Sequence, residues 1–321
     1  MLVTGATGFI GAHVVEELVA AGYKVRGTSR SKDKAQFLLN YVEKTYGSGK
    51  LEIADVPDMI ADGAYDEAVV GVAGIVHLAS ILTFSNKPDE VIAPSVKGTL
   101  NILKSATKEP KVKSLVVTSS STAACMPSVD KKATITKDSW NDFAVKAAYE
   151  PNPDGYVVYA ASKTEAERAL WEAVKATSPP FQVSAVLPNA NFGTRLRPTG
   201  NSTGDWIYGL YNGKDDLFNI PPQFYIDVSD DAKLHVAALV DSSANGQRLF
   251  GFAGTYNPNE ILAIFRKLEP SKTFLEDRQV GNDLTEVPNE DAEALLKKHY
   301  GHGWTSLEES LKRNIAPPAT E

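Results

Sequence analysis

The sequence has very little cysteine and no excess of positive charge. Cys125 is the single cysteine among 321 residues, so the chain cannot form an internal disulfide, and this usage favours a reducing compartment. No basic neighbour in the sequence would activate its thiol, and we expect a small buried residue there. The formal net charge of −7 comes without a basic stripe, which argues against nucleic acid or an anionic membrane surface as a partner.

Long apolar runs, repeats and clusters of metal ligands are also missing. No run approaches the ~20 apolar residues of a membrane span, and the first residues lack the basic leader of a signal peptide. No His/Cys group has metal-ligand spacing; His299, His302 and Trp304 fall in a glycine-rich segment where structural roles are expected. The sequence predicts a cytoplasmic protein without metal, monomer or homodimer, that acts on a small molecule.

The overall composition, with 43% hydrophobic and 23% charged residues, is that of an ordinary globular enzyme. The length suits one large α/β body with a smaller lobe. β-prone segments alternate with helical patterns up to residue 188, as in a doubly wound parallel sheet, the Rossmann architecture. Strands are expected at 2–4, 23–30, 50–54, 73–80, 112–118 and 181–187, and helices at 12–21, 89–107 and 156–177. His77, inside an apolar strand, is expected to be a packed core histidine.

A glycine-rich turn near the N-terminus predicts a nucleotide site. Leu2-Val3-Thr4 is β-prone and runs into Gly5-Ala-Thr-Gly8-Phe-Ile-Gly11, after which helical apolar spacing begins. Strand, glycine turn and helix in this order start a dinucleotide-binding unit, in which glycines let backbone amides approach a pyrophosphate. The glycine spacing is looser than Gly-x-Gly-x-x-Gly, and only four residues precede the turn, so the expected first strand is short.

Basic residues after the second predicted strand favour a cofactor with an additional phosphate. Where this fold binds NAD, an acidic residue about 20 positions past the glycines accepts from the ribose 2′-hydroxyl. Ser29 stands there instead, with Arg30 adjacent and Lys34 on the following turn. Both cations suit charge-assisted contacts to a 2′-phosphate, so NADPH is the expected cofactor; the alternative for both is a solvated loop.

Tyr159-Ala-Ala-Ser-Lys163 lies within a predicted helix. Four residues is just over one turn, so the phenol and the ammonium project from the same face. A nearby ammonium favours the phenolate, and moving a phenol from pKa ~10 to neutrality corresponds to roughly 4 kcal/mol. The spacing alone is common on surfaces. It gains weight from the glycine turn and from Ser119-Ser120-Ser121-Thr122, hydroxyls at a strand end that either form turn bonds or donate to a substrate oxygen.

The alternating pattern ends at Pro188. Several aromatic residues follow within 200–222, where we expect the wall of an apolar substrate pocket, the alternative being ordinary packing. The segment from Tyr225 predicts a strand and a helix capped by Ser229 or Asp230, and amphipathic helices are expected at 261–267 and 290–299. The predicted division assigns 1–188 and about 224–242 to the nucleotide-binding domain, and 189–223 and 243–321 to a substrate-binding lobe. The expected pocket residues are Phe84, Asn189, Trp206 and Tyr208.

Four motifs together resemble the extended short-chain dehydrogenase/reductases. They are Gly5-x-x-Gly8-x-x-Gly11, Ser119-Ser120, Tyr159-x-x-x-Lys163 and Leu187-Pro188-Asn189. Within that family, Val25-Arg-Gly-Thr, Tyr159-Ala-Ala-Ser-Lys-Thr-Glu-Ala-Glu, Ala185-Val-Leu-Pro-Asn and Pro270-Ser-Lys-Thr-Phe are similar to the fungal NADPH-dependent aldehyde reductase II and carbonyl reductase group, which is related to dihydroflavonol reductases.

The resemblance implies a role for each of these residues. Tyr159 would donate a proton to the carbonyl oxygen, Ser120 (or, failing that, Ser121) would hydrogen-bond this oxygen, and Lys163 would lower the tyrosine pKa and hold the nicotinamide ribose. The implied cofactor contacts are Gly5, Thr7, Gly8, Phe9, Ile10 and Gly11 for the pyrophosphate, Arg30 and Lys34 for the 2′-phosphate, Asp58 and Met59 for the adenine, and Ala79, Ser80, Thr118 and Pro188 for the nicotinamide half.

The expected activity is NADPH-dependent reduction of aldehydes or ketones to alcohols, with bulky substrates such as β-ketoesters and aryl ketones. A sugar-nucleotide epimerase or dehydratase shares the Ser-Tyr-Lys set, but such enzymes usually hold NAD and contact a diphosphate. Arg30 and the apolar lobe weigh against that alternative. A non-catalytic nucleotide sensor would be expected to have lost the triad, whereas all three residues stand.

Overall fold

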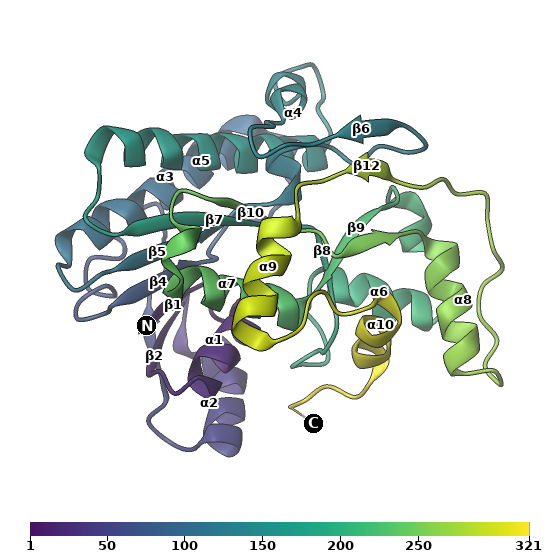
Figure 1. The fold of residues 1–321 in the computed structure, drawn as a ribbon, viewed down its shortest axis with the longest axis horizontal. Coiled ribbons are helices and arrows are strands. Elements are labelled where there is room, and N and C mark those ends of the chain that lie inside the picture. The colour runs from purple at the N-terminus through teal and green to yellow at the C-terminus, as the bar shows by residue number, and fades with distance from the viewer. Residues whose placement is uncertain (321) are drawn as a thin grey trace.

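A seven-stranded parallel sheet forms the centre of the larger part of the protein, in a computed structural model that describes residues 1–320 (Figure 1). Its strand order is β10-β7-β5-β4-β1-β2-β3, and every neighbouring pair is parallel. The strands are β1 (Leu2–Thr4), β2 (Val25–Ser29), β3 (Leu51–Asp55), β4 (Gly74–His77), β5 (Ser114–Thr118), β7 (Gln182–Pro188) and β10 (Arg248–Gly251). The order reverses between β1 and β4, which confirms the predicted doubly wound architecture and places a ligand crevice at this point.

Helices cover both faces of this sheet. One face carries α3 (Pro88–Lys108) and α5 (Gly155–Thr177), which pack against each other. The other face carries α1 (Phe9–Ala20), α2 (Lys32–Tyr46), α7 (Val228–Val240) and α9 (Glu290–Tyr300) (Figure 1). Leu115, Val116 and Val117 of β5 show why the central strands are continuous apolar runs: all three are buried, since helices cover both sides.

The smaller lobe is built around a second sheet of three strands in the order β11-β9-β8. Its core is aromatic: Phe192, Tyr256 and Phe265 are fully buried. The lobe comprises β8 (Ala190–Phe192), α6 (Thr203–Tyr211), η2 (Asp216–Asn219), β9 (Gln223–Asp227), β11 (Gly254–Tyr256), α8 (Pro258–Leu268) and α10 (Leu307–Ile315). Chain segments cross repeatedly between the lobe and the larger body, so neither part is one continuous stretch of sequence.

The structure amends the predicted division and one predicted cap. β10, assigned from sequence to the lobe, pairs with β7 in the central sheet, because its short run offers no local signal and its place is fixed only by tertiary packing. The helix α7 is capped by Asp227, whose side chain accepts from the Ser229 amide at 2.9 Å. Asp230, one of the predicted caps, instead accepts from the Thr305 amide at 2.6 Å.

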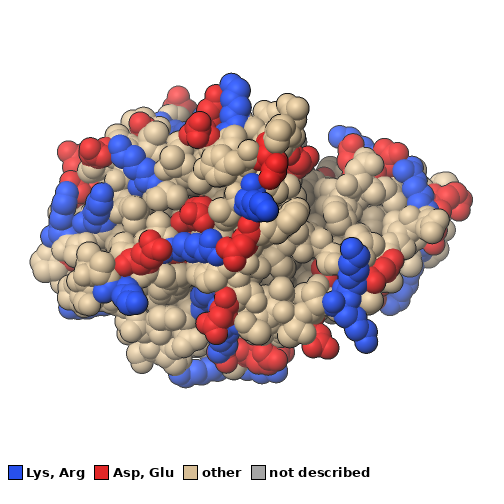
Figure 2. Space-filling view, turned by 90° about the horizontal axis from the view of Figure 1, so that it is seen from above, with Lys and Arg blue, Asp and Glu red and all other residues tan. Residues whose placement is uncertain are grey.

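The polar segment 126–155 forms a surface excursion with structure of its own. It contains α4 (Asp142–Ala147) and the strand β6 (Lys132–Thr134), which pairs in parallel with β12 (Leu284–Glu286) from the C-terminal part. Two further short helices are η1 (Ser121–Ala123) and η3 (Ser242–Ala244). Basic and acidic side chains are interspersed over the face in Figure 2. No helix within residues 1–320 combines the length and apolarity needed to cross a membrane.

Candidate active site

The carboxyl ends of β1, β4, β5 and β7 meet in a cleft of about 760 Å³ that opens toward the lobe. The predicted glycine turn, serine run and Tyr/Lys pair all border it, although they are far apart in sequence. Its lining residues are Gly5, Gly8, Phe9, Ile10, Gly11, Leu78, Ser80, Leu82, Thr118, Ser119, Ser120, Tyr159, Lys163, Pro188, Asn189, Asn191, Ser202 and Thr203. The sequence signals therefore converge on one place in the fold.

The glycine turn has no room for side chains. Gly5 has φ +64°, and a Cβ there would lie 2.9 Å from the Ala79 nitrogen. At Gly11 a Cβ would lie 2.2 Å from the Gly5 carbonyl oxygen. No side chain caps the N-terminus of α1 and no acidic residue stands in its first turn, so this end is free to receive a pyrophosphate. Thr7, which does not line the cleft, lies half-buried in the same turn.

The end of β2 adjoins this turn, since the Ala6 amide donates to the Thr28 carbonyl at 3.2 Å. Beyond it, Arg30 and Lys34 are both exposed, Lys34 in the first turn of α2. Buried Ser29 offers no carboxylate at the ribose position. This set of residues fits a nucleotide with a 2′-phosphate.

The residues expected near the adenine lie at the exit of β3. Asp58 is exposed, and its Oδ1 accepts from the Ile60 amide at 2.9 Å. Met59 is half-buried and packs so closely on α3 that a Cβ at Gly98 would lie 2.2 Å from its Cε. Met59 therefore reaches the crevice side of the sheet, while the Asp58 carboxylate is engaged in its own turn.

Tyr159 is half-buried on α5, close to Ser120 at the end of β5. Burial raises the pKa of the Tyr159 phenol, and a side-chain hydrogen bond with Ser120 opposes this shift. Ser120 in turn accepts from the Thr122 hydroxyl at 3.0 Å and the Thr122 amide at 3.3 Å. A phenol with a raised pKa keeps its proton at neutral pH, which a proton donor requires.

Lys163 faces the same strand end from one turn further along α5. Its Nζ donates to the Thr118 carbonyl at 3.2 Å, and burial lowers its pKa to about 8 while Glu167 opposes the shift. The sequence led us to expect that Lys163 lowers the pKa of Tyr159. In the structure, burial is the main influence on the phenol pKa and the Lys163 ammonium donates to the Thr118 carbonyl, so the effect of Lys163 on Tyr159 stays a prediction.

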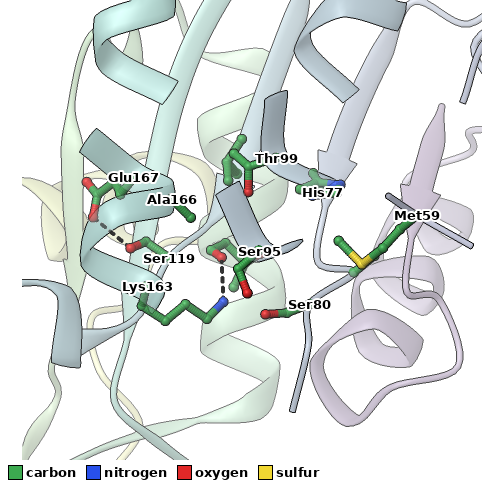
Figure 3. A pocket seen from close by; sticks show the side chains of 12 residues that line it. Met59, His77, Ser80, Ser95, Thr99, Ser119, Lys163, Ala166 and Glu167 are labelled. Atoms are coloured by element: carbon green, nitrogen blue, oxygen red, sulfur yellow. Dashed lines mark hydrogen bonds between the residues drawn. The ribbon is translucent and has the colours of Figure 1, made fainter. Parts of the chain in front are cut away.

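A second, smaller cavity of about 370 Å³ lies behind Lys163 (Figure 3). Met59, Ala79 and Ser80, all predicted cofactor residues, line it together with Thr118. His77 also borders it, with its Nδ1 2.8 Å from the Thr4 hydroxyl. Burial lowers the pKa of His77 to about 3, so this histidine is neutral, as expected of a core residue.

The predicted substrate residues divide into two groups. The Phe84 ring lies 5.1 Å from the Tyr159 ring, centroid to centroid, and Asn189 lines the cleft. Tyr208 is stacked 3.6 Å from the Arg195 guanidinium, and Trp206 packs against the lobe core. Neither of these two residues lines the cleft. The prediction failed for them because aromatic composition alone does not distinguish a pocket wall from core packing.

Two buried polar groups behind the site were missed from the sequence. His235 Nε2 lies 2.8 Å from the Thr118 hydroxyl, and its Nδ1 lies 3.2 Å from Oδ1 of Asp231. On the other side, Glu167 accepts from the Ser119 hydroxyl at 2.6 Å and pairs with Arg248. The sequence does carry a signal for both groups, a spacing of four residues on a helix. It relates His235 to Asp231 and Glu167 to Lys163.

No group of three or more His, Cys, Asp or Glu side chains suited to a metal occurs in the part of the chain that the structure describes. Cys125 is partly buried, and burial raises the pKa of its thiol to about 12, so it is a poor nucleophile at neutral pH. Asp241 binds the predicted structural histidine His299 at 2.7 Å.

Known proteins resemble this chain in both sequence and structure. Residues 1–248 match the model of the NAD dependent epimerase/dehydratase family. Aldehyde reductase 2 of Sporidiobolus salmonicolor is 43% identical over 97% of this chain and 94% of its own length. Ketoreductase adrE of Penicillium rubens is 36% identical over 98% of this chain and 95% of its own length. Yeast methylglyoxal/isovaleraldehyde reductase Gre2, solved in complex with NADPH, superposes with a TM-score of 0.82 at 28% identity, over 98% of this chain and 96% of that one.

Proposed function

The chain belongs to the NAD dependent epimerase/dehydratase family, and from that premise we propose that it reduces aldehydes or ketones to alcohols with NADPH at the cleft formed by Ser120, Tyr159 and Lys163. Relatives named aldehyde reductase and ketoreductase span nearly its whole length, and a structural relative holds NADPH. The predictions of an NADPH-dependent carbonyl reductase and of its family are thereby confirmed. The roles of individual residues and the choice of substrate are our proposal.

One observation carries the assignment of roles: a phenol that burial keeps protonated, a serine hydroxyl beside it, and a glycine turn with no room for a Cβ at Gly5 and Gly11 share one cleft. NADPH, when bound, supplies the hydride. Tyr159 gives its proton to the carbonyl oxygen as the oxygen gains charge, and Ser120 donates a hydrogen bond to the same atom. Lys163, fixed by the Thr118 carbonyl, places a positive charge near the phenol and favours the departure of the proton.

The surroundings of Tyr159 favour bulky apolar carbonyl compounds such as aryl ketones and β-ketoesters. Leu82 and Phe84 are exposed apolar residues, of which Leu82 lines the cleft and Phe84 packs on the Tyr159 ring. Asn189 and Thr203 add polar groups to the lining of the cleft, Thr203 from α6 of the lobe. We also propose that the lobe, which supplies Asn191, Ser202 and Thr203 to the cleft, takes part in substrate binding. The cytoplasmic location and the monomeric or dimeric state stay predictions.

A spectrophotometric assay tests the proposal. Loss of the NADPH absorbance is followed with a panel of aldehydes, aryl ketones and β-ketoesters, for the wild type, Tyr159→Phe and Tyr156→Phe. Tyr159→Phe should lower kcat/KM by roughly 10²- to 10⁴-fold while NADPH binding persists, because only the proton donor is removed. Tyr156, whose ring stacks 6.2 Å from that of Tyr159, is the matched control and should keep most of the activity.

Three outcomes would contradict the proposal. Turnover of a nucleotide sugar without net NADPH loss would indicate an epimerase. NADPH binding without turnover of any carbonyl would indicate a sensor. Equal effects of the two tyrosine substitutions would remove Tyr159 from the role of proton donor.

A further inference from the structure

Glu167 is a buried carboxylate on α5, one helical turn beyond Lys163. It is 2% exposed, yet four hydrogen bonds satisfy its two oxygens. The donors are the Ser119 hydroxyl at 2.6 Å, Trp171 Nε1 at 3.1 Å, and Nε and Nη2 of Arg248 at 2.7 and 3.2 Å. A buried charge with this many partners is held in one position, and its removal would leave Arg248 without a counter-charge.

The hydrogen bond to Ser119 connects Glu167 to the reacting end of the site. Ser119 lies between Thr118, whose carbonyl accepts from Lys163, and Ser120, the proposed donor to the substrate oxygen. Figure 3 shows Glu167 and Lys163 on the same helix, each bonded to this short stretch at the end of β5. The two bonds together fix the strand end against the helix that carries Tyr159.

Arg248 extends this connection to the last strand of the sheet. It lies at the start of β10, and its Nη1 donates to the Lys137 and Ser139 carbonyls at 2.8 and 2.6 Å. Its guanidinium lies 4.0 Å from the centre of the Trp140 ring. The Glu167–Arg248 pair therefore joins α5, the sheet edge and the surface excursion in one buried network.

Glu167 also supplies negative charge to a site that otherwise disfavours a cation. Burial lowers the pKa of Lys163 to about 8, and Glu167 is the group that opposes this shift. The other titratable groups around Lys163 are Tyr159 on its own helix, His77 across the small cavity, and the His235–Asp231 pair of α7 behind Thr118. Tyr159 and His77 are both neutral near pH 7. Among the described residues that line the two cavities, Glu167 is the acidic one.

We propose that Glu167 is a positioning residue for carbonyl reduction: it anchors the Thr118–Ser120 strand end and holds Lys163 in its ammonium form. This inference rests on the proposed function of Ser120, Tyr159 and Lys163. The proposal gives Glu167 two roles: it anchors the strand end through the Ser119 hydrogen bond, and its negative charge acts on Lys163. Different variants remove each role separately.

The charge is tested directly by NMR of protein labelled with ¹³C-lysine, in which the Lys163 signal is identified by its absence in Lys163→Met. Glu167→Gln keeps the size of the side chain and removes its charge, so Lys163 should titrate about 1 pH unit lower than in the wild type. Glu167→Asp keeps the charge and should titrate close to the wild type. Glu165→Gln is the control for a lost carboxylate on the same helix, since Glu165 is half-buried and pairs with Arg168; no shift is expected.

The pH profile of kcat/KM tests the consequence for the reaction. The alkaline limb of Glu167→Gln should move to lower pH by the same amount as the Lys163 titration. Ser119→Ala, which removes only the anchor, should lower kcat several-fold without moving that limb. If Glu167→Gln does not fold because Arg248 is left unpaired, the double variant Glu167→Gln/Arg248→Gln removes both charges. It should shift the Lys163 titration in the same direction but by less, because loss of the Arg248 cation partly offsets loss of the carboxylate.

An unchanged Lys163 titration, or an unchanged alkaline limb, in a folded Glu167→Gln or double variant would overturn the proposal. A wild type that turns over no carbonyl would instead refute the proposed function, and the NMR titration would still decide whether Glu167 holds the charge of Lys163.

Discussion

At the scale of a single residue, we propose that Arg30 sets the preference of the enzyme between NADPH and NADH. It is exposed at the exit of β2, next to a Ser29 that carries no charge. A charge-assisted hydrogen bond contributes roughly 1.5–3 kcal/mol, so Arg30→Ala should raise the KM for NADPH about 10- to 100-fold and leave the KM for NADH nearly unchanged. Lys44→Ala, at an exposed position in the last turn of α2, is the control. Equal effects on both cofactors would remove the case for a phosphate contact.

His77 makes the folded state sensitive to acid. Its pKa is about 3 when buried and near 6.5 in the unfolded chain, so the unfolded state binds a proton that the folded state refuses. The contribution of the neutral His77 to the free energy of unfolding is fully present above pH 6.5. It falls toward pH 3 by up to about 1.4 kcal/mol per pH unit.

The test is the free energy of unfolding, from urea titrations at pH 7 and pH 5. His77→Asn should lose about 2 kcal/mol less than the wild type over this interval. His302→Asn, at an exposed histidine, should behave as the wild type. Identical losses in His77→Asn and the wild type would mean that other groups account for the acid sensitivity.

At the residue scale, the sequence predicts which side chains border the active site better than it predicts which atoms they contact. The predicted elements were enough to expect Ser120, Tyr159 and Lys163 at one cleft. Strand ends meet at one edge of a parallel sheet, and residues four apart on a helix project from the same face. It did not predict that Lys163 bonds the Thr118 carbonyl, nor that Tyr208 stacks on Arg195, since both depend on segments that only the tertiary fold brings together.

At the scale of the element, the start of α5 depends on Gly155. A Cβ there would lie 2.1 Å from the Phe84 carbonyl oxygen, so the glycine allows the loop after β4 to rest on the helix. Phe84 itself adopts φ +47°, which costs energy for a residue other than glycine and is maintained by this contact.

Gly155→Ala should therefore displace the Phe84 loop from Tyr159. We expect a KM for bulky ketones raised several-fold, an unchanged KM for NADPH, and about 1–3 kcal/mol less stability. Gly209→Ala in α6 is the control, because its nearest neighbour would lie 3.5 Å away and alanine favours the helix. Equal ketone KM values for Gly155→Ala and the wild type would show that the loop does not contribute to substrate binding.

Elements with strong local patterns were predictable, and those defined by tertiary pairing were not. The helix expected at 156–177 is observed at Gly155–Thr177, because its apolar period and its Asp154 cap are local. β10 and the parallel β6–β12 pair join segments far apart in the chain, and three or four residues carry too little period to identify a strand.

At the scale of the whole molecule, Arg195 holds the C-terminal segment to the lobe. It is 2% exposed, and its guanidinium donates to the carbonyls of Asn314, Pro198 and Ala316 at 2.8, 3.2 and 3.0 Å. Arg195→Leu leaves these acceptors unpaired and should lower the free energy of unfolding by about 3 kcal/mol, measured from urea midpoints.

The control for this prediction is Arg197→Leu, two residues away. Arg197 is half-buried, and within residues 1–320 its guanidinium donates to a single carbonyl, that of Gly200. Its loss should therefore lower the free energy of unfolding by less than about 1 kcal/mol. Comparable losses at the two positions would mean that Arg195 does not secure the C-terminal segment in solution.

The repeated crossing of the chain between the sheet and the lobe affects how this protein can diversify. A single recombination event between related genes cannot transplant the lobe, since its pieces are separated by α7, β10 and α9. New substrate ranges are therefore expected to arise from point changes along the rim, at positions such as Leu82, Phe84 and Thr203, while the hydride-transfer machinery is inherited intact.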